Sequence, residues 1–383
     1  MKNIFIVSSS RSEFGILKNI IINLSNSKRV KCKLIITGTH LNKKFGNTID
    51  EINNLKLKNL YKIKLKMGKT SSFNSCKISS ELIKKIGNLY KKDKPDCLVV
   101  FGDRFEMLPI SLVSFLYKVP ILHIGGGETT EGSSDESIRH AITKLSSFHF
   151  VTHEVHKKRL IQLGEKKENV FVIGSPGIEN IKKTKILTKS MLEKKFKFKF
   201  LKINIVVNFY PLTNKINKDK TYILELLNAL NKFKHTRIIF TSPAFDIGTD
   251  IITKEIKNFC KYNKNSLFFK SLGSTNYISL LKHSDLIVGN SSSGLIEAPV
   301  IGTRVINIGD RQKGRIRPKE IYDIKCNKQI IEKAIKKILN KKIKFTQIYP
   351  NINSSKKFLK IISKIDLKDS LTKKFIDIKK DEK

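Results

Sequence analysis

Along most of the chain, short runs of apolar residues alternate with segments whose apolar residues recur at helical spacing. The run at 2–7 (KNIFIV) is typical of a buried strand, and 14–24 repeats its apolar residues with the period of a helix. Strands that alternate with helices in this way favour a parallel sheet with helices on both faces. The predicted strands are 2–7, 33–37, 97–101, 120–124, 148–151, 170–173, 203–207, 237–240, 266–269, 286–288 and 304–308.

The predicted helices fall between these strands and form two groups. They are 14–24, 81–90, 107–117, 154–163, 222–233, 251–262, 276–283, 295–300, 329–339 and 356–365, with one more beginning near residue 133. The alternation breaks at Gly174–Gly177 and at a lysine-rich connector, 182–202, and then restarts. We therefore expect an α/β protein with two doubly wound, Rossmann-like domains that face each other across a cleft, over 1–176 and 177–350. A C-terminal helical segment and tail, 351–383, is expected to follow.

Composition narrows the class of protein. The 383 residues suffice for two ordinary domains, and no apolar run reaches the roughly 18 residues of a membrane-spanning helix, so no membrane association is expected. Five cysteines are scattered without the spacing of disulfide pairs or metal sites, which favours a cytoplasmic protein with no metal centre. The formal net charge of +42 comes from lysines spread over nearly every segment, which is typical of a lysine-favouring coding bias. A nucleic-acid partner is therefore not expected, although the charge helps to attract an anionic substrate.

Acidic and basic side chains cluster in the stretch 101–144, at the ends of predicted elements. Asp103 and Arg104 follow one predicted strand, and Glu128 ends a Gly-Gly-Gly-Glu turn after the strand at 120–124. The carboxyl ends of parallel strands lie at one edge of a sheet, where open α/β sheets bind their ligands. One loop of this kind is most simply an ordinary solvated turn, but three in succession favour a site.

The third part of this cluster is the predicted helix start, where Ser133 and Glu136 have capping-box spacing. Asp135 and Arg139 are one turn apart on what we expect to be the outer face of this helix, as are Glu136 and His140. Carboxylates, an arginine and a histidine are thus predicted to reach the same edge of the sheet as the two preceding loops.

The first predicted strand-to-helix turn, residues 8–15 (SSSRSEFG), lacks the G-x-G-x-x-G pattern of dinucleotide-binding folds. A nicotinamide or flavin cofactor is therefore not expected here. Arg11 in this turn is a candidate partner for a phosphate or a carboxylate-type group of a substrate. An ordinary surface arginine is an equal alternative.

A serine-rich loop in the second domain, residues 289–294 (GNSSSG), lies between a predicted strand and a predicted helix. Backbone N–H groups and hydroxyls at a helix N-terminus form a cradle for an anion such as a diphosphate. The cradle residues are Ser291, Ser292, Ser293 and Gly294. Glu297, which we place in the first turn of that helix, is suited to accept hydrogen bonds from a pair of sugar hydroxyls. A serine loop alone is usually only a helix cap, but the basic loop 310–317 (DRQKGRIR), which includes Arg315, follows the next strand and favours nucleotide binding.

Together these motifs make the chain resemble the UDP-N-acetylglucosamine 2-epimerase family. It is most similar to the hydrolysing members that make N-acetylmannosamine for sialic acid, and to relatives that act on UDP-N,N'-diacetylbacillosamine for legionaminic acid. The resemblance covers residues 2–317 and implies the GT-B architecture, a nucleotide held mainly by the C-terminal domain, and a homodimer. The segments that carry it are 8–15 (SSSRSEFG), 38–48 (GTHLNKKFGNT), 101–108 (FGDRFEML), 123–146, 174–177 (GSPG), 271–281 (SLGSTNYISLL) and 289–315.

The resemblance also implies a reaction: UDP is lost from C1 as the C2 proton is removed, and water then adds to the glycal to give the free 2-epimeric sugar. A sugar C2–H is a weak acid, so this chemistry needs positioned bases, and the departing diphosphate needs cationic or N–H partners. It needs neither a metal nor a redox cofactor. The residues at matching proton-transfer and water-activating positions are Asp103, Glu128, Asp135 and Glu136. Those at matching substrate positions are Arg11, Arg104, Arg139 and His140, then Ser291, Ser292, Ser293 and Glu297 at the diphosphate and ribose, and Tyr277 near the uracil.

One position departs from the family. Many relatives have a His-Pro pair after the first strand of the second domain, where this chain has Tyr210-Pro211. A phenol with an ordinary pKa of about 10 is a poor base at neutral pH and cannot become a cation, so the role of Tyr210 at the substrate stays open. The choice among UDP-N-acetylglucosamine, UDP-N,N'-diacetylbacillosamine and a GDP-linked sugar is open too. The alternatives are a GT-B glycosyltransferase, for which so many carboxylates are excessive, and a basic module that binds RNA or anionic polysaccharide, which would release no UDP.

Overall fold

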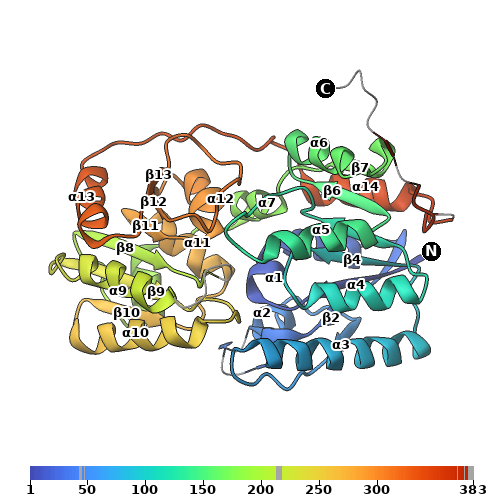
Figure 1. Cartoon of the computed structure of the whole chain (residues 1–383), viewed down its shortest axis with the longest axis horizontal. Coiled ribbons are helices and arrows are strands. Elements are labelled where there is room, and N and C mark those ends of the chain that lie inside the picture. Colours follow the sequence, from blue (N-terminus) through green and yellow to red (C-terminus); the bar gives the residue numbers. More distant parts are fainter. Residues whose placement is uncertain (43–44, 47, 213–217, 369, 375, 378–383) are drawn as a thin grey trace.

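The chain forms two parallel sheets, each covered by its own helices (Figure 1). A computed structural model describes residues 1–42, 45, 46, 48–212, 218–368, 370–374, 376 and 377, so three positions of the 38–48 motif (43, 44 and 47) lie outside the described residues. The first sheet has the order β3-β2-β1-β4-β5-β6-β7 and the second β10-β9-β8-β11-β12-β13. In each sheet the order reverses beside the first strand, which is the doubly wound arrangement that the sequence predicts.

The strands agree with the sequence prediction apart from two short edge strands that it did not include. Their bounds are β1 Lys2–Ser8, β2 Val30–Ile36, β3 Leu60–Lys62, β4 Cys97–Phe101, β5 Ile121–Ile124, β6 Phe148–Val151, β7 Val170–Val172, β8 Ile203–Asn208, β9 Thr236–Thr241, β10 Ser266–Phe269, β11 Leu286–Gly289, β12 Arg304–Ile308 and β13 Tyr322–Ile324. Every predicted strand is present. The unpredicted strands, β3 and β13, have three residues each and lie at sheet edges, so they are too short to show a hydrophobic pattern.

Helices pack on both faces of each sheet. Their bounds are α1 Arg11–Ser25, α2 Ile49–Asn53, α3 Ser72–Lys92, α4 Met107–Leu116, α5 Asp135–Leu145, α6 Glu154–Gln162, α7 Pro176–Lys183, α8 Lys189–Phe196, α9 Asp219–Leu230, α10 Thr249–Tyr262, α11 Ser274–Lys282, α12 Ser292–Ile301, α13 Lys328–Leu339 and α14 Ser354–Lys364. Alternate residues of β1 explain the two layers: Ile4 and Ile6 pack with α1, whereas Phe5 and Val7 pack with α3 and α4.

The Gly-Ser-Pro-Gly segment at 174–177, expected to be a break, is the start of a helix. Ser175 is the N-cap of α7 and its hydroxyl accepts a hydrogen bond from the Ile178 N–H at 3.4 Å. Pro176 occupies the first helical position, where its missing N–H has no intrahelical partner to lose. The residues that signalled a loop are therefore those that begin α7.

The C-terminal helix α14 returns to the first domain. Phe358 and Ile362 are fully buried in the same core as α1, and the Phe358 ring lies 4.5 Å from that of Phe150 on β6. In Figure 1, α14 lies beside β6 and β7, away from the second sheet whose last helix precedes it. The predicted C-terminal segment at 351–383 thus contains a helix that completes the first domain's core.

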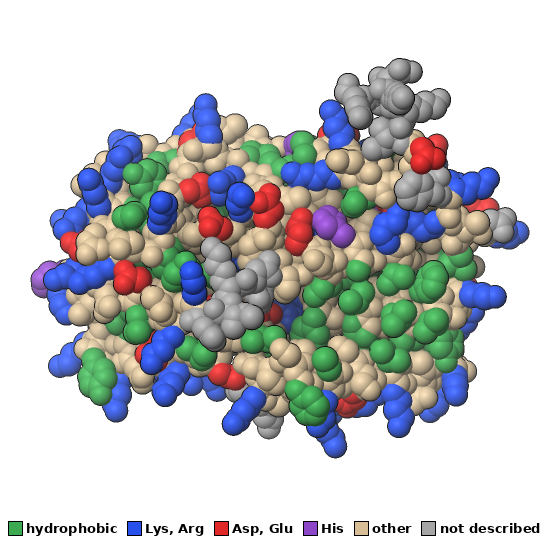
Figure 2. All heavy atoms as spheres, in the orientation of Figure 1, with side chains coloured by type: hydrophobic (Ala, Val, Ile, Leu, Met, Phe, Trp, Pro, Cys, Tyr) green, Lys and Arg blue, Asp and Glu red, His purple; other side chains and the backbone are tan. Residues whose placement is uncertain are grey.

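Basic side chains are scattered over the visible face of the molecule instead of forming one patch (Figure 2). Acidic side chains, with basic ones beside them, gather across the upper middle of the same face, where the two domains meet. Within the described ranges, no helix is both long enough and apolar enough to cross a lipid bilayer.

Candidate active site

Loops that follow strands of the two domains contact each other, and Arg139 is the centre of the first domain's side of this contact. This residue lies on α5 and is 1% exposed. One terminal nitrogen donates to the Asp103 carboxylate, and the other donates to the Glu136 carboxylate at 2.7 Å and to the Glu128 carbonyl at 2.8 Å. A single buried guanidinium therefore connects three of the four predicted acidic positions.

Two expectations about α5 are wrong. Arg139 does not lie on the outer face beside Asp135, because oxygen acceptors at the sheet edge draw its guanidinium inward. Nor does Glu136 close a capping box with Ser133: α5 begins after Ser134, the Ser133 hydroxyl accepts from the Asp135 N–H at 3.4 Å, and the Glu136 carboxylate accepts from the Thr130 N–H and from Arg139.

The predicted pairing of Glu136 with His140 is present, with 3.1 Å between the carboxylate and Nε2 of the imidazole. His140 lies one turn after Glu136 on α5, and its side chain is 31% exposed. The other ring nitrogen, Nδ1, is buried without a protein partner.

The acids differ in proton affinity. Burial alone would raise the pKa of Asp103, but the charges of Arg139 and of two arginines from the second domain hold the pKa below its ordinary value. Burial, together with the negative charge of Asp103, raises the pKa of Asp135 to about 6. Burial would also raise the pKa of Glu136, but hydrogen bonds from His140 and a backbone N–H, with the charge of Arg139, lower it to about 2. Such a separation of carboxyl pKa values is typical of acid–base sites.

The second domain supplies cations opposite these acids. Arg315 pairs with the Glu128 carboxylate at 3.1 Å, and the two side chains are 10% and 13% exposed. Arg311 lies 3.7 Å from the Asp135 carboxylate. Both arginines come from the basic loop after β12, of which the sequence singled out only Arg315. A two-domain ion-pair set therefore crosses the cleft.

The loops that carry these pairs are in direct contact. The Glu131 N–H donates to the Lys313 carbonyl at 3.1 Å. A Cβ on Gly132 would lie 2.3 Å from the Asp310 carbonyl oxygen, so only glycine allows this approach.

The first strand-to-helix turn is closed to phosphate by its own glutamate. The Glu13 carboxylate accepts from the Ser9 N–H at 2.6 Å and from the Ser10 N–H at 3.1 Å, which are the donors that a phosphate would use at the α1 N-terminus. Burial raises the pKa of Glu13 to about 7. Arg11 lies just beyond, where its guanidinium reaches the Lys270 carbonyl of the second domain at 3.5 Å.

Arg104 joins the domains instead of standing free for a substrate. Its guanidinium forms a two-point contact with the fully buried Glu106, at 3.0 and 3.1 Å. It also donates to the Phe245 carbonyl at 3.3 Å and lies 3.9 Å from the Asp246 carboxylate. These engaged donors make Arg104 a support of the cleft.

The N-terminus of α12 lies at the serine loop where the anion cradle is predicted. The Ser291 hydroxyl caps the helix by accepting from the Ser293 N–H at 3.3 Å. The Ser293 hydroxyl bonds to the Tyr277 hydroxyl at 2.6 Å, which in turn accepts from the Asn208 amide at 2.9 Å. Gly289 has φ +148° and a Cβ there would lie 1.9 Å from the Asn208 carbonyl oxygen. The approach of β11 to β8 therefore requires glycine.

Glu297 is the sixth residue of α12, so its expected place in the first turn is wrong. It lies one turn after Ser293, with which it forms a hydrogen bond, and burial raises its pKa. Ser292 and Gly294 occupy the first and third helical positions, as a cradle requires.

Tyr210, which replaces the histidine of many relatives, is part of the same edge. Its backbone exchanges two hydrogen bonds with the Asn290 side chain, at 2.7 and 2.9 Å. The Arg311 guanidinium lies over its ring, 5.0 Å from the centroid. A phenol ring can hold Arg311 by a cation–π contact, which a protonated histidine would repel.

The sequence prediction assigned no individual role to Arg311, Glu13 or Glu106. Glu13 had a usable signal, because Ser10 and Glu13 have capping-box spacing and the box is present. Arg311 was visible only as one of several basic residues in its loop. Nothing in the sequence marks Glu106 as the partner of the arginine two residues before it.

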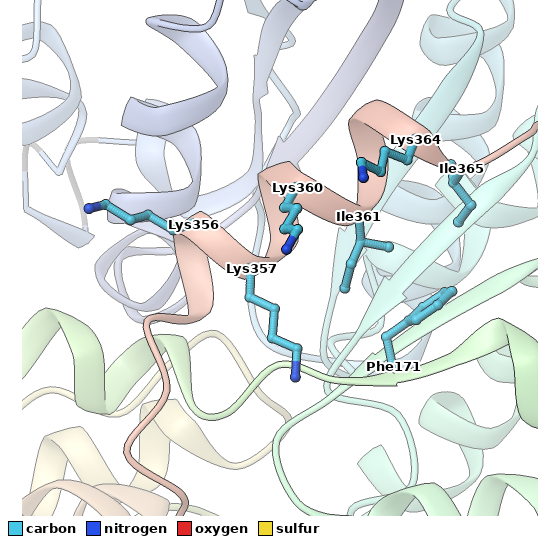
Figure 3. Close-up of a pocket in the computed structure, with 7 residues that line it drawn as sticks. All are labelled: Phe171, Lys356, Lys357, Lys360, Ile361, Lys364 and Ile365. Carbon is cyan, nitrogen blue, oxygen red and sulfur yellow. The ribbon is translucent and has the colours of Figure 1, made fainter.

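A groove of about 610 Å³ lies elsewhere, between α14 and β7 (Figure 3). Its lining contains none of the predicted site residues. The lining residues are Phe171, Lys356, Lys357, Lys360, Ile361, Lys364 and Ile365. The candidate active site is therefore the region where the acids of the first domain meet the arginine loop of the second.

Solved structures of known proteins share this two-domain architecture. The solved structure of the Methanocaldococcus jannaschii UDP-GlcNAc 2-epimerase, in complex with UDP-GlcNAc and UDP, superimposes with a TM-score of 0.78 at 21% sequence identity, covering 94% of this chain and 99% of that one. The fold is GT-B-like, as expected from the sequence.

Sequence comparison gives the family. The chain is 38% identical over 344 residues, 90% of its length and 89% of the relative's, to the GDP/UDP-N,N'-diacetylbacillosamine 2-epimerase (hydrolyzing) of Campylobacter jejuni. It is 36% identical over 94% of its length to the polysialic acid biosynthesis protein P7 of Escherichia coli, of which 88% is covered. The family model for UDP-N-acetylglucosamine 2-epimerase matches residues 22–363. The chain belongs to the UDP-N-acetylglucosamine 2-epimerase family.

Proposed function

We propose that this protein is a hydrolysing UDP-sugar 2-epimerase that converts UDP-N-acetylglucosamine and water to UDP and N-acetylmannosamine through a glycal, for nonulosonic acid biosynthesis. The observation that carries the proposal is that two half-sites meet where the domains contact each other. Acids with separated pKa values stand on one side, and a helix N-terminus with two arginines stands on the other.

In the first step, Asp135 accepts the C2 proton of the sugar. Its pKa of about 6 makes it a stronger base than Asp103 or Glu136, whose pKa values are lowered. The C2–H electron pair forms the C1=C2 double bond, the C1–O bond breaks, and its electron pair leaves on the β-phosphate oxygen. The N–H groups at the start of α12 and the guanidinium of Arg311 stabilise that diphosphate.

In the second step, water adds to the glycal. A carboxylate takes one proton from the water as its oxygen bonds to C1, and C2 receives a proton on the face opposite to the one that lost it. We assign this exchange to Glu128 and the Glu136–His140 pair, because Arg139 bonds the Glu136 carboxylate and the Glu128 backbone carbonyl beside Asp103. Asp103 stays ionised beside Arg139 and favours positive charge developing on the sugar ring.

UDP-N,N'-diacetylbacillosamine is the closest alternative substrate. The Campylobacter jejuni relative is named for that substrate and its GDP-linked counterpart, whereas the Escherichia coli relative is named for polysialic acid biosynthesis. Both alternatives need the same acids and the same cradle. We also infer domain boundaries near residues 176 and 350, a cytoplasmic location, and a homodimer.

Incubation with UDP-N-acetylglucosamine and no acceptor tests the proposal against a GT-B glycosyltransferase. A hydrolysing epimerase releases UDP and N-acetylmannosamine in equal amounts. A non-hydrolysing epimerase would give UDP-N-acetylmannosamine with no free UDP. A transferase would give at most slow hydrolysis to N-acetylglucosamine, and either of these last results would reject the proposal.

A further inference from the structure

Glu165 is a buried carboxylate on the far side of α5 from the cleft, and the reaction proposed above does not use it. It lies between α6 and β7 and is 2% exposed. Its oxygens accept from the Lys144 ammonium at 2.9 Å, from His149 Nε2 at 2.9 Å, and from the Lys373 ammonium at 2.6 Å. Three donors from α5, β6 and the C-terminal tail therefore meet on this one side chain.

Lys373 also caps the C-terminus of α5. Its ammonium donates to the carbonyls of Thr143, Lys144 and Ser146, at 3.2, 3.1 and 2.8 Å. The last carbonyls of a helix have no intrahelical donors, and a positive charge there is favourable to the helix dipole. This cap is supplied from 227 residues along the chain, beyond the 22–363 segment that matches the family model.

Arg139 fixes the middle of α5 to the sheet edge, and the tail contacts its C-terminal end. Among the 11 residues of the helix the buried ones are Arg139, Ile142 and Thr143. Lys144, in its last turn, turns away to the Leu163 carbonyl and Glu165. The position of the C-terminal end of the helix therefore depends on the tail that contacts it.

The opposite end of α5 carries the chemistry. Asp135, Glu136, Arg139 and His140 lie in its first two turns, and the Asp135 carboxylate lies 3.7 Å from Arg311 of the second domain. A displacement of about 1 Å at a catalytic group costs roughly 100-fold in rate. An anchor at residues 143–146 is rigidly connected to these groups by about two turns of helix.

We propose that Lys373 is a positioning residue for the reaction: its ammonium, clamped between Glu165 and the C-terminal carbonyls of α5, holds that helix so that its acids stay in register with the arginine loop. The catalytic role of α5 in this inference rests on the proposed function. The anchoring of α5 by Lys373 rests only on the contacts described above. Lys373 does not reach the cleft, so it acts only through α5.

The test compares Lys373→Met, Lys373→Arg and the matched control Lys374→Met, whose side chain is exposed on the same tail. For Lys373→Met we expect kcat to fall about tenfold while KM stays within twofold, because the nucleotide cradle is in the other domain. The pH midpoint of the acid limb of kcat/KM should also move, because the surroundings of Asp135 change. Lys373→Arg should recover most of kcat, since a guanidinium keeps both charge and donors.

Amide hydrogen exchange separates this inference from the proposed function. Lys373→Met should speed amide exchange across 135–146 at least tenfold, while exchange in the strands stays unchanged. This measurement does not depend on turnover. Control-like kinetics and exchange in Lys373→Met would overturn the inference. So would a parallel loss of kcat and rise in KM that arginine does not recover, since that would indicate general destabilisation. If the wild-type protein releases no UDP, the proposed function fails by itself, and the exchange data still decide whether Lys373 anchors α5.

Discussion

Arg139 determines how the acids of the first domain behave, because it is buried among them and cannot be deprotonated at physiological pH. Its guanidinium bonds to Asp103, Glu136 and the Glu128 backbone. Its charge holds Asp103 ionised, and it adds to the hydrogen bonds from His140 and a backbone N–H that hold Glu136 ionised. Asp135, which lies outside this set of contacts, keeps the high proton affinity that a base needs near neutral pH.

Replacement of Asp103 by asparagine is the first residue-scale prediction. We expect kcat to fall by about 1000-fold, since the negative charge beside the reacting ring is lost. UDP affinity, measured by calorimetry, should change less than threefold because the cradle is in the other domain. Asp50→Asn, at an exposed aspartate of α2, is the matched control and should match wild type. Full turnover by Asp103→Asn would remove Asp103 from the mechanism.

The second residue-scale prediction concerns the pH dependence of kcat/KM. Below the Asp135 pKa of about 6 the carboxyl is protonated and cannot accept a proton, so activity should fall tenfold per pH unit under an acid limb with its midpoint near that value. Glu136, with its pKa at about 2, cannot produce this limb. Asp135→Asn should abolish the limb along with most activity, whereas Glu154→Gln, at an exposed site, should leave it in place. A flat wild-type profile from pH 5 to 8 would contradict the assignment.

At the scale of elements, helix α12 and its neighbours form a cradle that is stiff before any ligand arrives. The Asn208–Tyr277–Ser293 chain of hydrogen bonds joins β8, α11 and α12. Glycine at 289 lets β11 approach β8 closely enough for this chain to form. Such preorganisation reduces the free-energy cost of ordering the site when a diphosphate binds.

Tyr277→Phe tests the cradle. The hydroxyl makes contacts of 2.6 and 2.9 Å, and its loss should weaken UDP binding about tenfold, or about 1.4 kcal/mol, by leaving Ser293 unsupported. The value of kcat should stay within threefold because the acids are untouched. Tyr262→Phe, at a ring 83% exposed on α10, is the control. Equal UDP affinity in the two variants would show that the hydrogen-bond chain does not support the cradle.

Most strands and helices could be predicted from the sequence, because the spacing of apolar residues within a segment indicates its secondary structure. Edge strands β3 and β13 escaped because three residues are too few to show a period. The start of α5 was misplaced for a different reason: Glu136 has the spacing of a cap, but Thr130 and Arg139 compete for its carboxylate in the folded chain. Local patterns carry no information about such competition.

At the scale of the whole molecule, the cleft is held by contacts between residues far apart in sequence. Arg315 meets Glu128, Arg104 meets Phe245, and Gly132 meets the Asp310 backbone. The sequence indicated that both half-sites exist and would face each other. The sequence did not indicate that Arg104 would support the interface between the domains, because the group that Arg104 contacts there is a backbone carbonyl of the other domain.

Arg315→Met tests the ion pairs across the cleft. Glu128 would lose a partner at 3.1 Å in surroundings where both side chains are mostly buried, which costs about 3 kcal/mol and should lower kcat/KM about 100-fold. Arg317→Met removes a cation from the same loop but breaks only a more exposed pair with Asp323 inside the second domain, so it should stay within threefold of wild type. Similar losses in the two variants would mean that the loop's total charge matters, and not the pair.

The central claim is that both half-sites act on one sugar, so that C1–O cleavage and C2 epimerisation occur together. Proton NMR in heavy water, with UDP-N-acetylglucosamine and UDP-N,N'-diacetylbacillosamine supplied separately, follows both events at once. The account predicts release of UDP with a free 2-epimeric sugar that carries deuterium at C2, from at least one of the two. Release of a sugar that retains its C2 proton and configuration, or no release of UDP from either, would contradict it.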